Sequence, residues 1–144
     1  MATKVQWSQV LVCAFLIFGD TKLVWSQSAV DVGKKEYITS CAPCHGITGK
    51  GDGLIAKSFH SPPTDLTKLS DGNNGALPIL RIYYTIHGAT QTDAHGSREM
   101  PVWGNVFSRQ LKYPGSTLSD TEIKSMVDER ILALIEYIST LQSK

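Results

Sequence analysis

Two cysteines and a histidine stand together at residues 41–45, which read Cys-Ala-Pro-Cys-His. This spacing is the attachment signature of c-type haem. Two thiols separated by two residues can add to the two vinyl groups on one edge of a porphyrin. The next residue then lies under the iron, where its imidazole serves as an axial ligand. The motif therefore predicts one haem c, attached covalently through Cys41 and Cys44, with His45 as the proximal iron ligand.

Other interpretations of the cysteine pair stay open at this point. A thioredoxin-like pair begins a helix in a βαβ context, but no strand pattern surrounds this one. A zinc site usually needs a second pair of cysteines or histidines at regular spacing, and the sequence has none. A disulfide between Cys41 and Cys44 and a chance occurrence of the motif are two further alternatives. An export signal and a candidate for the second iron ligand favour haem.

The second axial ligand must come from a methionine or histidine after residue 45. The candidates are His60, His87, His95, Met100 and Met126. Met100 precedes Pro101, which fixes the backbone, and Gly104 would allow the chain to turn back sharply. A rigid loop of this kind would hold a thioether at one distance from iron, so Met100 is the predicted ligand. Met126 lies on or near the apolar face of a helical pattern, where methionine usually fills the core.

Ligation by two histidines is the alternative, with His87 or His95 opposite His45. His87 stands at the end of an apolar helical pattern, before Gly88, where a histidine also serves as a helix C-terminal cation. His95 and His60 lie in polar stretches and are expected to be solvated.

The N-terminus has the pattern of a secretory signal peptide. Lys4 gives a positive start, and residues 10–18 form an apolar run that ends at Gly19 and Asp20. The run is about half of the ~20 residues that a transmembrane helix needs. We expect residues 1–26 to be cleaved before Gln27 and the protein to be exported to the periplasm. An uncleaved membrane anchor is the alternative.

The remaining residues, 27–144, have the length of one domain. Removal of the signal peptide would leave equal numbers of basic and acidic residues and would take Cys13 away. Haem would add two propionates. The absence of a basic stripe in the sequence argues against nucleic acid and against an anionic membrane surface as partners. No membrane span is expected in the mature form.

Hydrophobic periodicity predicts helices at both ends of this domain. The first begins near Ala29, after a possible capping box at Ser28 and Asp31, and runs into the cysteine motif. The last begins after Ser119, with Glu122 completing a capping box, and apolar residues recur every three or four positions as far as residue 141.

Between them, a helix is predicted over residues 77–87, with Gly88 as its stop. A short helix is expected over residues 54–59. The rest of residues 46–75 is rich in Gly, Pro, Ser and Thr, and is expected to wrap the cofactor as a loop.

With these motifs, the chain resembles class I monohaem bacterial cytochromes c over about residues 29–142. The residues that carry the resemblance are Gly33, Tyr37, the motif with Gly46, Gly49, Gly51, Gly53, Pro62 to Leu66, Ile86 to Gly88, Met100 to Gly104 and Tyr137. The resemblance implies an all-α cytochrome c fold of three to five helices wrapped around one haem. The first and last helices would cross, with Gly33 letting Tyr137 approach. A polar insertion at residues 90–97 departs from the family pattern.

The resemblance also implies roles for residues around the cofactor. Pro43 or a nearby carbonyl would orient His45. Trp103 and Arg81 would reach the propionates, although core packing and a solvated helix face are their ordinary alternatives.

The implied function is a periplasmic electron carrier and not an enzyme. It would act as a monomer that docks transiently on redox proteins, with Lys34, Lys35, Lys50 and Lys57 flanking the docking edge. The alternatives are a haem subunit of a larger oxidoreductase complex, or a catalytic or gas-binding haem protein with an open sixth site.

Overall fold

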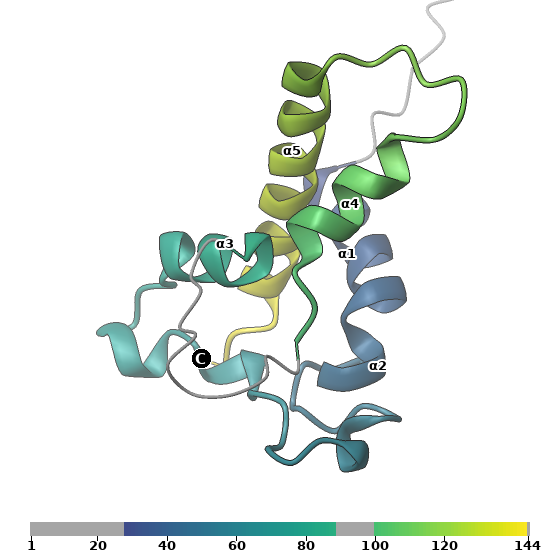
Figure 1. Ribbon diagram of the computed structural model, residues 1–144. Helices are drawn as coiled ribbons and strands as arrows, with labels where there is room; N and C mark the ends of the chain where they lie inside the picture. Colours follow the sequence, from purple (N-terminus) through teal and green to yellow (C-terminus); the bar gives the residue numbers. More distant parts are fainter. Residues whose placement is uncertain (1–27, 89–99, 144) are drawn as a thin grey trace, which may run out of the picture.

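A computed structural model of the chain describes residues 28–88 and 100–143. Its α-helices are α1 (Ala29–Ser40), α2 (Ala42–His45), α3 (Ile79–His87), α4 (Trp103–Leu111) and α5 (Asp120–Thr140) (Figure 1). Three single turns of 3₁₀-helix lie between α2 and α3, at Ala56–Ser58, Leu66–Lys68 and Asp71–Asn73. The described residues contain no strand, which confirms the all-α prediction. None of the described helices combines the length and the apolarity of a membrane span. The predicted signal peptide lies outside the described residues.

The crossing of α1 with α5 joins the two ends of the domain. A side chain at Gly33 would place its Cβ 1.9 Å from the carbonyl oxygen of Ala133, so only glycine permits this approach. The prediction that Gly33 would make room for Tyr137 was wrong, because the Ala133 backbone occupies that place. Tyr137 instead packs on Tyr37, with ring centroids 5.1 Å apart.

The caps of these two helices largely follow the sequence prediction. Ser119 and Glu122 form a complete capping box on α5. At α1, the Ser28 hydroxyl accepts from the Asp31 N–H at 3.2 Å and donates to the Asp31 carboxylate at 2.8 Å. The predicted apolar stripe of α5 is buried from Ile123 to Ile138. Met126 was wrongly expected in the core, because it is 42% exposed.

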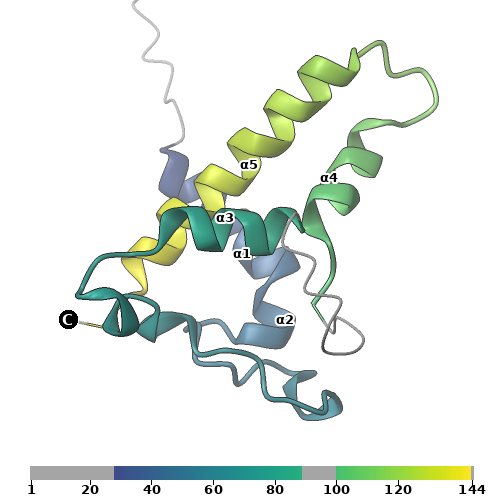
Figure 2. The same ribbon diagram turned by 60° about the vertical axis from the view of Figure 1, so that its left-hand side comes forward.

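Helix α3 lies across α5 (Figure 2). It ends where predicted, because Gly88 adopts a left-handed conformation at φ 91°. Ile82 and Ile86 turn into the core. The Tyr83 hydroxyl donates to Asp128 of α5 at 2.6 Å, and this bond to a carboxylate raises the pKa of Tyr83 to about 12. These contacts hold α3 against α5, and α3 forms one wall of the interior of the molecule.

Helix α4 was not predicted, since Gly104 had been interpreted as part of a returning loop. The helix buries Phe107 completely, and the guanidinium of Arg130 lies 4.2 Å from the centre of that ring. Arg130 also donates to Glu36 of α1 at 2.5 Å and to Gln110 of α4 at 2.8 Å. One side chain of α5 thus bonds to both α1 and α4.

The short helix expected over residues 54–59 is the 3₁₀ turn Ala56–Ser58. The chain from α2 to α3 passes below α3 and faces it in Figure 2. This segment and α3 therefore form opposite sides of the interior.

Substitution Gly33→Ala should destabilise the fold by about 3 kcal/mol or more, because a backbone carbonyl cannot rotate away from the added methyl group. Gly72→Ala is the matched control, since a Cβ there meets nothing within 4 Å. Urea unfolding followed by circular dichroism measures both variants. Equal stability of the two would contradict the close crossing.

Candidate haem site

Two adjoining cavities of about 190 and 140 Å³ lie between α2, α3 and the segment that joins them. They share Cys41, His45, Thr64 and Met100 as lining residues. The other side chains of the first cavity include Ser40, Cys44, Phe59, Pro62, Pro101 and Trp103. Those of the second include Leu66, Leu69, Arg81, Ile82, Ile86 and Ile138. Most of these side chains are apolar, and they come from parts of the chain far apart in sequence.

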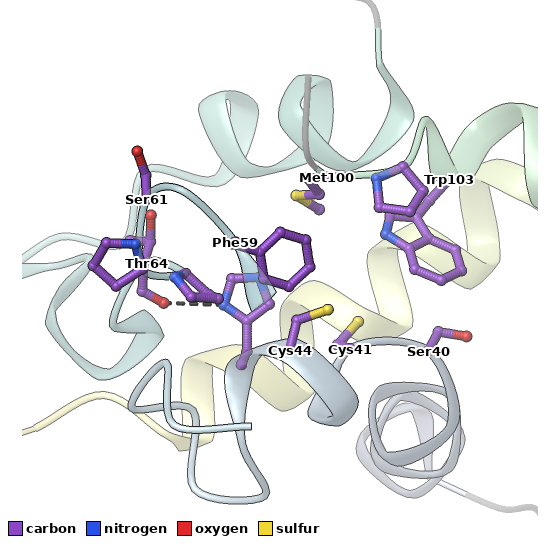
Figure 3. Close-up of a pocket in the computed structure, with 12 residues that line it drawn as sticks. Ser40, Cys41, Cys44, Phe59, Ser61, Thr64, Met100 and Trp103 are labelled. Carbon is purple, nitrogen blue, oxygen red and sulfur yellow. Dashed lines mark hydrogen bonds between the residues drawn. The ribbon is translucent and has the colours of Figure 1, made fainter. Parts of the chain in front are cut away.

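The helix turn at residues 41–45 places both cysteines on the same side. The Cys41 N–H donates to the Tyr37 carbonyl at 2.8 Å, and the His45 N–H donates to the Cys41 carbonyl at 2.9 Å. The helical path therefore continues through Cys41, and both sulfur atoms point toward the space below Met100 (Figure 3). The motif and the predicted second ligand face one another.

Both cysteines are free thiols in the structure. Cys41 is only 8% exposed, and burial raises its pKa to about 12, with a smaller contribution from the Glu36 carboxylate. Burial also raises the pKa of Cys44. Two free thiols therefore line one largely apolar cavity, and in the folded chain both are neutral near pH 7.

The His45 ring is oriented by a backbone carbonyl from another segment. Its Nδ1 lies 3.0 Å from the carbonyl oxygen of Thr64. Because a carbonyl oxygen only accepts, Nδ1 carries the hydrogen and the lone pair of Nε2 is available to a metal. Burial lowers the pKa of His45, although the bond to Thr64 opposes this shift. The imidazole is therefore neutral near pH 7, as a metal ligand must be.

Sequence reasoning had placed this carbonyl at Pro43 or nearby. Pro43 was wrong, because its carbonyl accepts from the Ile55 N–H at 3.0 Å. The Pro62–Leu66 stretch was noted only as part of the resemblance, and its place in the site depends on the fold. The Leu66 N–H donates to the Gly49 carbonyl at 2.7 Å, which ties the stretch to the loop after the motif.

Gln142, near the C-terminus, holds the following part of that loop. Its amide oxygen accepts from the N–H and the hydroxyl of Ser70, at 3.1 and 3.2 Å. Its amide nitrogen donates to the carbonyls of Leu66 and Ile138, at 2.7 and 3.0 Å. One side chain thus connects the end of α5 to a cavity wall. No sequence pattern had indicated Gln142.

The remaining predicted site residues lie at the cavity edges. Trp103 begins α4, lines the first cavity and packs on Phe107 with a centroid distance of 5.6 Å. Arg81 is exposed and lines the second cavity from α3. Their contacts to the propionates stay a prediction.

The alternative second ligands are poorly placed. His87 stacks on Tyr83, with ring centroids 5.6 Å apart, and lines neither cavity. His60 is exposed, and Met126 lines a surface groove between α1 and α5. His95 and the insertion at residues 90–97 lie outside the described residues. Within the described ranges, no group of three Cys, His, Asp or Glu side chains is arranged to hold a metal, so the zinc interpretation gains no support.

The family model for cytochrome c matches residues 30–142 of this chain, and the chain therefore belongs to the cytochrome c family. No curated protein and no solved structure gives a significant match. Membership confirms the predicted cytochrome c fold, implies haem c as the cofactor and assigns the protein to a class that generally transfers electrons. The donor set fits this cofactor, since two free thiols, a neutral imidazole nitrogen and a thioether surround one apolar interior.

Substitution Gln142→Ala should destabilise the protein by about 1–3 kcal/mol, because Ser70 and Leu66 lose partners that water replaces only in part. Amide hydrogen exchange in residues 66–70 should accelerate more than exchange in α4. Gln142→Glu tests the cause, because it retains the acceptor for Ser70 and removes the two N–H donors. Uniform acceleration over both segments would contradict the specific connection.

Proposed function

We propose that this protein is a class I monohaem cytochrome c that carries single electrons in the bacterial periplasm. The haem would be attached through thioethers to Cys41 and Cys44, with His45 and Met100 as axial ligands. The observation that supports this most directly is that Met100 lines both cavities together with Cys41 and His45. The proposed mature protein begins at Gln27, after cleavage of the signal peptide.

Bound haem would accept and release one electron reversibly, as its iron alternates between the ferric and ferrous states. The residues around the haem would set its reduction potential. The thioether of Met100 would favour ferrous iron and so raise the reduction potential. The apolar lining from Leu66, Leu69 and Ile138 disfavours the additional charge of the ferric state. The Thr64 carbonyl keeps His45 in its ligating tautomer.

If His45 and Met100 both bind the iron, they would leave no coordination place for a substrate. This supports an electron carrier over a catalytic or gas-binding protein. A permanent haem subunit of a larger oxidoreductase complex would have the same haem site. The mass of the native particle distinguishes a monomer from such a subunit.

The optical spectrum of the purified holoprotein tests this proposal. The ferric form should show the weak sulfur-to-iron band, and the ferrous form should not respond to carbon monoxide. Met100→Ala should abolish the band and admit carbon monoxide, whereas Met126→Ala should change neither, because that methionine lies on the surface. If Met100→His left the spectrum and the potential of the wild type unchanged, the assignment of Met100 would be wrong.

The proposed partners are redox proteins that dock briefly at the edge of the motif. Ile47 and Leu54 follow the motif and are 74% and 94% exposed, so the chain after the motif presents two large apolar side chains to solvent. Lys50 and Lys57 lie in the same loop and are also exposed. Weak docking surfaces for electron transfer are commonly small. Exposed apolar side chains and cations in one loop would suit a partner whose docking face is acidic.

Reversal of both charges, in Lys50→Glu with Lys57→Glu, should change the salt dependence of reduction by ferrocyanide, which is an anion. Added salt should slow the wild type and should slow the variant less. Arg109→Glu with Lys124→Glu alters the net charge equally near the end of α4 and near the start of α5, and these two helix ends lie far from α2 in Figure 1. Equal salt slopes for the two double variants would argue against a cationic docking edge.

A further inference from the structure

The C-terminus of α3 and the N-terminus of α4 approach one another at a second glycine contact. A Cβ on Gly104 would lie 2.6 Å from the carbonyl oxygen of His87 and 3.3 Å from Cδ2 of that ring. Gly104 lies in the first turn of α4 and is buried. Since the closer atom belongs to the backbone at the end of a helix, it cannot turn aside to admit a side chain.

A second contact lies beside the first. Gly88 ends α3 in a left-handed conformation, and a Cβ on it would lie 2.3 Å from Cγ1 of Val102. Val102 is the N-cap of α4, and its carbonyl accepts from the Asn105 N–H at 3.1 Å. We call these four residues, His87, Gly88, Val102 and Gly104, the α3–α4 junction.

The junction lies two residues from Met100. Only Pro101 separates Met100 from Val102, and its ring removes one of the backbone rotations between them. Meanwhile, Ile82 and Ile86 of α3 line the same cavity as Met100. The place where α4 rests on α3 therefore determines how far the Met100 segment stands from that cavity wall.

We propose that Gly104 is a positioning residue for the thioether of Met100. A side chain at position 104 would lift the first turn of α4 from the end of α3 and carry Val102, Pro101 and Met100 with it. The thioether would then stand farther from the iron, and the sixth coordination site would open. This inference rests on the proposed ligation by Met100 and assigns a further residue to the same site.

Holoprotein with Gly104→Ala tests the proposal against Gly72→Ala, whose Cβ would meet nothing within 4 Å. The Gly104 variant should lose most of the ferric sulfur-to-iron band, bind carbon monoxide in the ferrous form and have a lower midpoint potential. Its pyridine haemochrome spectrum should remain that of a haem with two thioethers, because the cysteine motif is untouched. A variant that is less stable but keeps the wild-type band and potential would overturn the proposal.

Val102→Ala provides a second measurement if the Gly104 variant does not accumulate. It removes the methyl groups that rest on Gly88 and introduces no overlap, so it should shift the band and the potential in the same direction by less. A folded Val102 variant with the wild-type spectrum would overturn the proposal in that case. A wild-type holoprotein without the band would instead overturn ligation by Met100 itself, and this inference with it.

Discussion

The contact between Gly33 and the Ala133 carbonyl sets the frame on which the rest of the molecule is built. It holds the first helix against the last at backbone distance, and the cysteine motif follows directly at the end of α1. Because α5 also carries Arg130, which bonds to Gln110 of α4, and leads to Gln142, the same crossing sets where α4 and the loop after the motif can lie. A shift of α1 along α5 would change the position of the thiols relative to the other walls of the interior.

Around this frame, the site depends largely on backbone atoms. The Thr64 carbonyl orients His45, the Gly46 carbonyl accepts from the Tyr37 hydroxyl at 2.8 Å, and the His87 carbonyl lies where a side chain on Gly104 would be. Backbone groups cannot change rotamer, so they hold distances more strictly than long side chains do. A cofactor in this interior would gain from walls that cannot adapt, because rigid groups do not relax when the charge of the interior changes.

The parts of this architecture that were predictable depend on residues close together in sequence. The motif at residues 41–45, the capping box of Ser119 and Glu122, and the stop of α3 at Gly88 are each encoded within a few positions. Local patterns did not reveal α4, because Gly104 disfavours a helix by itself and Phe107 becomes buried only against α5. Thr64 and Gln142 could not be found either, since a backbone carbonyl has no residue signature and the Gln142 amide bonds residues more than 70 positions away.

The crossing of the two terminal helices also imposes an order in time. A polypeptide is made from its N-terminus, so α1 and the cysteine motif exist well before α5 is complete. Until then, Gly33 and Tyr37 have no partner, and Cys41 cannot take up the buried place that it has in the finished fold, where 8% of it is exposed. Reactions of the Cys41 thiol with large molecules therefore belong to the immature chain. Once α5 is complete, the buried position of Cys41 would exclude such large reactants.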